Sequence, residues 1–258
     1  MLAINPFAAL SGSISPGVIQ AYVVLMAVLV AAGTVFDIVH KGSARYFFDN
    51  WRRAKSKAQR LGGGELASIA VQTAVVDFLA SGEFCNARRR VAHLLTMYGF
   101  IIYVVSTVVL VFGYPSTAAA EPWPQLWWLG GLLVLIGGYW FWFFIRVDVA
   151  AEGASPWRVM RADLFVLSLL ASVTLGLIWA WVQANGSSWS HAWFALYILA
   201  TTVLFGSVPW SKFAHMFFKP AAAFEKRVSN ANGTRANLPA PAEKPEQFGK
   251  TPKHAHHY

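Results

Sequence analysis

The sequence predicts an all-α integral membrane protein, a bundle of five transmembrane helices with its N-terminus outside and its C-terminus in the cytoplasm. Four long runs lack any Asp, Glu, Lys or Arg, namely residues 1–36, 91–120, 122–145 and 164–211. A bilayer core about 30 Å thick needs roughly 20 apolar residues as a helix. The first three runs therefore hold one span each, and the fourth holds two spans and a turn. A mean hydropathy of +0.46 and a charged fraction of 13% exclude an ordinary soluble domain.

The orientation follows from where the basic residues lie. Residues 41–92 hold ten of the 21 lysines and arginines, residues 146–163 hold three and residues 212–258 hold eight. The connections 116–123 and 184–191 hold none. Because Lys and Arg concentrate in cytoplasmic loops, all three basic regions are expected in the cytoplasm. The net charge of +9 is then a feature of topology and gives no indication of a nucleic-acid partner.

The N-terminal region predicts a retained membrane helix. Residues 1–15 are uncharged and are expected at the outer interface, and the first span runs from residue 16 to residue 40. No Lys or Arg precedes it, whereas a cleavable signal peptide has a basic start and a shorter apolar stretch. The single cysteine, Cys85, excludes an internal disulfide and an all-cysteine metal site within this chain.

Residues 41–90 form an unusually long connection for a membrane protein. After the glycines 62–64, apolar residues and a threonine recur at helical spacing, which predicts a short amphipathic helix on the cytoplasmic interface or under a partner. Two interpretations stay open: a docking surface for another protein, or a solvated basic connector. The residues that set the spacing are Leu66, Ile69, Thr73 and Val76.

The remaining spans are expected over residues 90–113, 123–147, 163–184 and 190–209, the last with an extension to residue 218. Tryptophans at both ends of the third span are typical of the two membrane interfaces. The five-helix membrane domain thus covers residues 16–220. Residues 221–258 are expected to form a cytoplasmic, largely disordered tail, because Asn, Pro, Lys and Ala dominate from Ser229 onward without an apolar period.

Two histidines lie at the same, cytoplasmic margin of the long apolar region. His93 follows three arginines in the first turn of the second span, and His215 lies just beyond Pro209. Two imidazoles from two helices at one depth are what a bis-histidine haem requires, and Arg89, Arg90 and Lys212 lie close in sequence to balance the haem propionates. The alternative is a pair of interfacial histidines that hold no ligand.

The blocks 88–100 (RRRVAHLLTMYGF) and 209–220 (PWSKFAHMFFKP), together with the five-span layout, resemble the gamma-subunit family of respiratory nitrate reductase. Residues 76–100 are most similar to the cytochrome subunit of the quinone-interacting membrane oxidoreductase. By size, the chain is most similar to the membrane anchor of adenylylsulfate reductase. The resemblance covers residues 16–220 and implies a b-type cytochrome subunit with His93 and His215 as metal ligands.

The same resemblance limits the number of haems. Members of this family with two haems carry a second histidine about ten residues further along the second span, on the same helix face. Here that position is Tyr103, and its counterpart on the fifth span falls near Tyr197. The resemblance thus implies one haem b at most and puts the family's outer quinol site in doubt. His40 is a fallback ligand, and His191 stands alone at the outer end.

The expected function is a membrane anchor and electron-transfer subunit in a bacterial inner membrane. It would link a cytoplasmic iron–sulfur flavoprotein oxidoreductase, adenylylsulfate reductase by resemblance, to membrane quinone. The sequence shows no nucleophile, metal triad or nucleotide loop of its own, so we expect no catalysis by the isolated chain. The alternative is a haem-free anchor that only recruits the soluble enzyme. A transporter is disfavoured because no charge lies at a span centre and no inverted repeat is present.

Overall fold

A computed structural model of the chain describes residues 2–40, 61–82, 86–118, 121–148, 153–210 and 215–233. All regular secondary structure in these residues is helical, which confirms the all-α prediction. The chain divides into two compact units. Unit 1 comprises Met1–His40 and Asn86–Ala214, and unit 2 comprises Lys41–Cys85 and His215–Tyr258.

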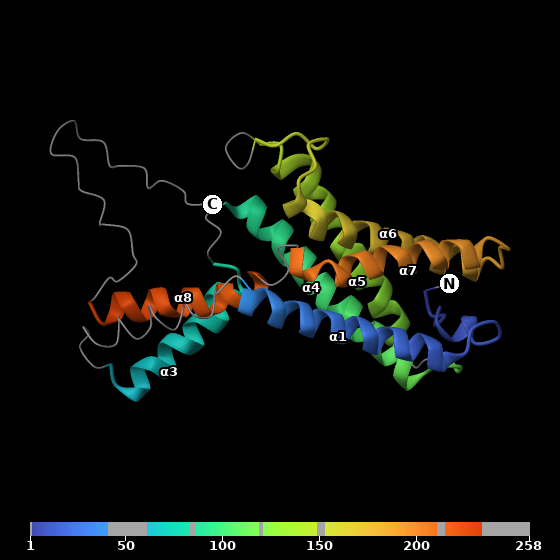
Figure 1. Ribbon diagram of the computed structural model, residues 1–258, viewed down its shortest axis with the longest axis horizontal. Helices are drawn as coiled ribbons and strands as arrows, with labels where there is room; N and C mark the ends of the chain where they lie inside the picture. Colours follow the sequence, from blue (N-terminus) through green and yellow to red (C-terminus); the bar gives the residue numbers. More distant parts are fainter. Residues whose placement is uncertain are drawn as a thin grey trace. The chain divides into compact units, whose positions relative to one another are not determined.

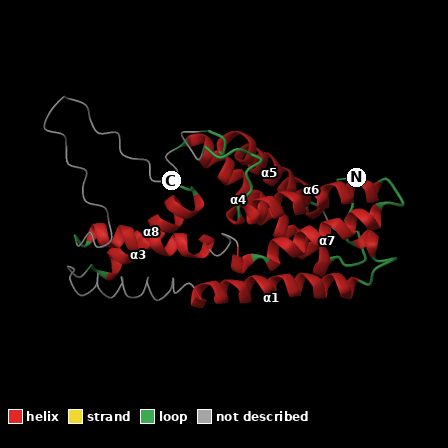
Figure 2. Cartoon of the chain, turned by 45° about the horizontal axis from the view of Figure 1, so that its top comes forward, coloured by secondary structure: helices red, strands yellow, loops and turns green. Residues whose placement is uncertain are grey.

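Unit 1 contains five long helices that lie side by side (Figures 1 and 2). Two of them continue without a break into a π-helical turn, α4 into Val109–Gly113 and α5 into Phe141–Ile145. The helices are α1 (Pro16–His40), α4 (Ala87–Val108), α5 (Trp123–Trp140), α6 (Leu164–Ala184) and α7 (Ser190–Gly206).

Four of these helices are long and apolar enough to cross a membrane: α1, α6, and α4 and α5 with their π-helical ends. The helix expected for the first span, residues 16–40, is confirmed with the same bounds. With 17 residues, α7 is about 26 Å long. The predicted extension of this helix to residue 218 is wrong. The helix ends at Gly206 and a 3-10 turn, Val208–Trp210, follows, because Pro209 has no N–H and cannot continue an α-helix.

Contacts between the helices fix their directions. His191 contacts Ser13 just before α1, and Gly33 of α1 lies against Val208 just after α7, so α1 and α7 run in the same direction. Near the start of α1, Gln20 donates to the carbonyl of Val111 at the end of α4. One end of unit 1, which we call the N-terminal end, therefore gathers the starts of α1, α5 and α7. The opposite end, which we call the basic end, gathers the starts of α4 and α6.

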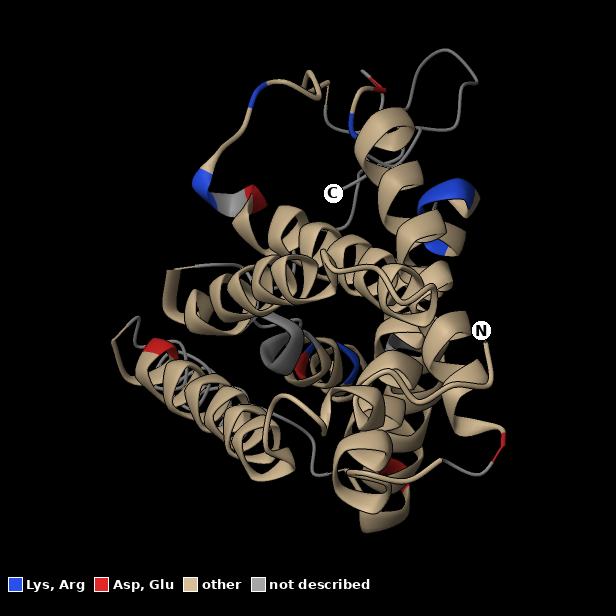
Figure 3. Ribbon diagram, turned by 90° about the vertical axis from the view of Figure 1, so that its right-hand side faces the viewer, with Lys and Arg blue, Asp and Glu red and all other residues tan. Residues whose placement is uncertain are grey.

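Charged residues lie outside the middle of the helices in unit 1 (Figure 3). The arginines Arg88, Arg89 and Arg90 lie in the first turn of α4, and Arg146 follows α5 at the same end. Within the described residues of unit 1, all arginines are thus at the basic end.

The N-terminal residues before α1 fold into the N-terminal end of the bundle. The carboxamide of Asn5 donates to the carbonyls of Tyr114 (2.8 Å) and Leu110 (3.4 Å), which the end of α4 leaves without helical partners. Phe7 is buried with its ring against Trp127 and Trp179, and Gln183 donates to the carbonyl of Pro6. The predicted interfacial segment is therefore a packed part of unit 1.

Glycines bring the backbones of α4 and α5 into direct contact. A Cβ placed on Gly130 would lie 2.6 Å from the backbone nitrogen of Tyr103, and one on Gly137 would lie 2.6 Å from the carbonyl oxygen of Ala92. Backbone atoms cannot move aside as a flexible side chain can. Such small-residue contacts are a means by which membrane helices pack closely.

Replacing Gly130 by alanine is expected to force α4 and α5 apart and to lower the free energy of unfolding by about 1–3 kcal/mol, the usual cost of overpacking. Thermal unfolding of the purified protein measures the effect. Gly206→Ala is the matched control, because a Cβ there has no neighbour within 4 Å among the described residues. Equal unfolding temperatures for the two variants would contradict the close packing of α4 and α5.

Unit 2 contains α3 (Gly63–Gln72), its π-helical continuation Thr73–Leu79, and α8 (His215–Ala231). These helices pack on one another, and Arg227 of α8 donates to the side chain of Gln72 at 3.3 Å. The predicted short helix after the glycines is confirmed, with Thr73 buried and Val76 exposed.

The beginning of the predicted disordered tail is helical. Residues 221–231 belong to α8, in which Ala223, Val228 and Ser229 are buried. Burial of these small apolar and polar side chains in unit 2 explains the helix, which the tail composition did not indicate. Residues 234–258 lie outside the described part of the chain.

Candidate functional site

Two tyrosines meet in the interior of unit 1. Tyr103 in the middle of α4 and Tyr197 in the middle of α7 are both 5% exposed, and their hydroxyl oxygens are 3.4 Å apart in a hydrogen bond. Tyr103 stacks on Trp127, with ring centroids 4.9 Å apart, and Tyr197 stacks on Trp179 at 5.7 Å. The sequence analysis singled out these two positions, and the structure brings them together.

A glycine of α6 makes room for the tyrosine pair. A Cβ on Gly176 would lie 2.6 Å from the hydroxyl oxygen of Tyr103 and 3.0 Å from the ring of Tyr197. The pair is thus enclosed by α4, α6 and α7. The two oxygens bond directly to each other, so these side chains leave no space between them for an iron and a porphyrin ring.

The tyrosine pair borders a cavity of about 360 Å³. Side chains of α1, α4, α6 and α7 line the cavity, together with Phe7 from the N-terminal segment. Apolar groups dominate the lining, and the polar groups are all hydroxyls: Tyr22, Tyr103, Thr107, Ser172, Tyr197 and Thr201. An apolar cavity with a few hydroxyl groups suits a neutral ligand that carries a hydrogen-bonding group.

Most of these hydroxyl groups are engaged in bonds within the protein. The hydroxyl of Thr201 donates to the carbonyl of Tyr197 one turn earlier and accepts from Ser172 at 2.7 Å. In the same way Thr107 donates to the carbonyl of Tyr103 and accepts from the indole of Trp127. These residues were not singled out by the sequence. Their polarity within apolar spans was the signal that could have identified them.

His93, the first predicted haem ligand, lies near the start of α4 at the basic end. Asn86 begins this helix by accepting from the backbone N–H groups of Arg88 and Arg89, a standard N-cap. The His93 side chain is exposed, whereas Arg89 and Arg90 are half-buried. Helical spacing puts His93 on the same face of α4 as Phe100, which lines the cavity two turns further on.

His215, the second predicted ligand, belongs to unit 2 as the first residue of α8. Its side chain and the whole of Lys212 lie outside the described part of the chain. The pairing of His93 with His215 therefore stays a prediction. Within the described residues, no group of three or more His, Cys, Asp or Glu side chains could hold a metal ion.

The other two histidines of unit 1 lie at opposite ends. His40 at the end of α1 stacks on Phe36, with ring centroids 5.2 Å apart. His191 at the start of α7 is 2.9 Å from the hydroxyl of Ser13. Both contacts are of a structural kind.

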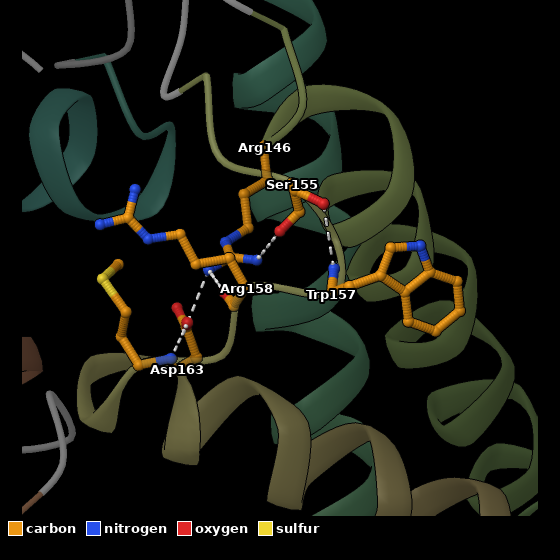
Figure 4. A network of polar contacts seen from close by, with 6 residues as sticks. Arg146, Ser155, Trp157, Arg158 and Asp163 are labelled. Carbon is orange, nitrogen blue, oxygen red and sulfur yellow. Dashed lines mark hydrogen bonds and ion pairs between the residues drawn. The ribbon is translucent and has the colours of Figure 1, made fainter.

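The connection between α5 and α6 is organised by one buried arginine (Figure 4). Arg146 is 1% exposed and donates to the carbonyls of Ser155 (3.1 Å) and Arg158 (2.8 Å) and to the carboxylate of Asp163 (2.6 Å). Its guanidinium also lies 4.1 Å from the ring of Trp142. Asp163 in turn accepts from the backbone N–H of Met160. The turn at the basic end is thereby fixed to the helix ends on both sides.

No protein family and no solved structure matches the chain. It is 28% identical over 167 residues to citrate utilization protein B of Escherichia coli, an alignment that covers 62% of this chain and 42% of that protein. It is 35% identical over 101 residues to NADH-ubiquinone oxidoreductase chain 6 of Gadus morhua, covering 34% of this chain and 58% of that one. The chain thus spans less than two thirds of the length of either relative. Taken with the fold, the comparisons show a helical protein with apolar helices of membrane-spanning length and a weak similarity to a subunit of a respiratory complex.

Proposed function

We propose that this chain is the membrane-embedded electron-transfer subunit of an oxidoreductase complex, and that it links a cytoplasmic enzyme to quinone in a bacterial inner membrane. The observation that carries the proposal is the arrangement of unit 1. Its helices are free of charge through their middle, and the described arginines gather with His93 at one end. The similarity to a chain of NADH-ubiquinone oxidoreductase supports a place in a respiratory complex.

The proposal includes five spans, with the N-terminus outside. In support, α7 runs alongside α1 from one end of unit 1 to the other. Its 17 residues, continued by the turn at Val208–Trp210, are near the length that a bilayer core requires. The basic end then faces the cytoplasm.

One haem b at the basic end would supply a one-electron carrier within the membrane. The described half of the site fits this group in its chemistry. His93 provides an imidazole on an accessible helix face, and Arg89 and Arg90 provide guanidinium groups beside it for the propionates. His215 is proposed as the opposite ligand, with Lys212 near it in sequence.

The proposed soluble partner is an iron–sulfur flavoprotein, and adenylylsulfate reductase is the candidate that the sequence resemblance favours. Residues 41–92 and 212–258, which carry most of the lysines and arginines, would provide its docking surface. A partner surface rich in Asp and Glu would be complementary to it.

A second candidate function is a haem-free anchor. The direct bond between Tyr103 and Tyr197 supports it, because these are the two positions that the sequence resemblance aligns with the outer haem ligands. A chain that lacks one haem can also lack the other. Recruitment of the soluble enzyme would then be the whole function.

A reduced-minus-oxidised absorbance spectrum of the freshly purified full chain tests the proposal. We expect a b-type signal with one haem per chain, quantified against protein concentration. A purified protein that binds its soluble partner but shows no b-type signal would establish the haem-free anchor instead.

A further inference from the structure

We propose that residues 63–79, which form α3 and its π-helical continuation, lie along the surface of an anionic bilayer, with the side chains of Val71, Val75 and Leu79 among the lipid tails just below the headgroups. The inference rests on the proposal that unit 1 spans a membrane, and it is independent of the haem and of the soluble partner. The sequence leaves two positions open for this helix, the membrane interface and the underside of a partner. The structure favours the first.

The first support is an apolar face on the outer side of this helix. Val71, Val75 and Leu79 follow one another in steps of four residues and are 62%, 50% and 45% exposed. The opposite side packs within unit 2, where Thr73 is buried. Residues 66–76 include no charged side chain. Both sides of the helix are therefore apolar, and an exposed apolar face of this kind marks a contact with lipid or with protein.

The second support is a positive charge at the edge of the apolar face. The guanidinium of Arg227 in α8 donates to the side-chain oxygen of Gln72 at 3.3 Å. Val76, which is also exposed, follows Gln72 by about one helical turn, so the guanidinium lies beside this face. Lys226, the neighbour of Arg227 in sequence, is exposed. Apolar side chains bordered by Lys and Arg are typical of helices that lie in the interface of an anionic bilayer.

The third support is the kind of apolar side chain on the outer side. All of those described are small or aliphatic: Ala67, Ala70, Val71, Ala74, Val75, Val76 and Leu79. The strongest contacts between proteins concentrate on anchors such as Trp and Tyr, which fill matching pockets, and no aromatic side chain is described on this face. Lipid tails are flexible and require no matching pocket. The face therefore suits lipid better than it suits a protein partner.

The fourth support is the short connection to a membrane-length helix. The π-helical continuation of α3 ends at Leu79, and α4 begins at Ala87. Even when fully extended, the chain between these two residues spans no more than about 29 Å. The helix is thereby kept within reach of the bilayer surface at which α4 begins.

The test uses the full chain with Cys85→Ser, one chain per nanodisc, in bilayers of phosphatidylcholine and phosphatidylglycerol. A spin label at Val71→Cys or Val75→Cys reports its collision rates with oxygen, which concentrates in lipid, and with a water-soluble nickel chelate. Ile101→Cys, at an exposed position in α4, is the lipid reference, and Ser188→Cys, in the turn between α6 and α7, is the water reference. We expect the ratio of oxygen to nickel collisions at both α3 positions to lie nearer to that of the lipid reference.

The lipid reference separates failure of this inference from failure of the proposed function. If the label at Ile101 gives a lipid value while those at Val71 and Val75 give the water value, the inference is overturned, unit 1 still spans the membrane, and the face is left for a soluble partner or a second copy. If the label at Ile101 also gives the water value, the proposed membrane-spanning function is overturned together with the inference.

A second measurement tests the role of charge. Lys226→Gln/Arg227→Gln removes both cations and is expected to lower the oxygen-to-nickel ratio at Val75 towards the water value. Lys226→Arg/Arg227→Lys keeps both charges and is the matched control, with a ratio expected to equal that of the unsubstituted pair. A ratio at Val75 that changes neither in the glutamine variant nor in bilayers of phosphatidylcholine alone would overturn the assignment of an anionic lipid.

Discussion

His93→Ala is expected to abolish the b-type absorbance of the purified protein, and His215→Ala is expected to do the same. A haem iron held by two histidines loses its low-spin spectrum when either ligand is removed. His93 is exposed in the first turns of α4, so its truncation leaves no cavity in the interior of unit 1. The measurement is the reduced-minus-oxidised spectrum, with circular dichroism to show that helix content is unchanged.

Two histidines of unit 1 serve as matched controls for that result. His191→Ala removes an imidazole at the N-terminal end, where the ring contacts Ser13, and should retain the full signal. His40→Ala removes the ring that stacks on Phe36 at the basic end and should also retain it. If His40→Ala lost the b-type signal while His93→Ala kept it in full, His40 and not His93 would be the haem ligand.

Arg146→Ala is expected to be among the most destabilising single substitutions in unit 1. The change leaves the carbonyls of Ser155 and Arg158 and the carboxylate of Asp163 without their donor. Removing one member of a buried ion pair costs about 3–5 kcal/mol. For a chain of this size we expect the unfolding temperature to fall by roughly 6–20 °C, as measured by thermal unfolding in detergent.

Two further variants separate geometry from charge at this position. Arg146→Lys keeps the positive charge but lacks the planar guanidinium that bonds to all three acceptors. We therefore expect a loss of stability between that of Arg146→Ala and the unsubstituted chain. Arg161→Ala removes an exposed arginine of the same connection and should change the unfolding temperature little. If Arg161→Ala lowered the unfolding temperature as much as Arg146→Ala, the total positive charge at the basic end would explain the stabilisation, and the buried network of Arg146 would not.

The helices were predictable because their causes are local. Pro16 suits the first position of a helix, and the segment from Gly113 to Pro115 and the turn at Asn185 and Gly186 end helices by backbone geometry. Gly186 has φ = +68°, a conformation that favours glycine. Each of these signals lies within a few residues of the boundary that it sets. The end of α7 is also set by a nearby residue, Pro209. The predicted extension to residue 218 was wrong because it did not allow for the helix ending before this proline.

The interior of unit 1 was not predictable because its causes are distant in sequence. Asn5 bonds to the carbonyl of Tyr114, and the tyrosine pair joins positions 103 and 197 across a glycine of a third helix. The family resemblance placed both tyrosines at corresponding heights, but their direct bond depends on the absence of a side chain at Gly176. In the sequence, Arg146 was counted as one of three arginines in a cytoplasmic connection. Its burial was not predictable, because it depends on the carbonyls of Ser155 and Arg158, which the following turn brings close to it.

The central claim is that electrons pass between membrane quinone and this chain. Its most direct test is to add a reduced short-chain quinol to the oxidised full chain in nanodiscs, without any soluble partner, and to record the b-type absorbance over time. We expect the reduced b-type band to appear. A band that dithionite produces but that excess quinol never does would contradict the claim.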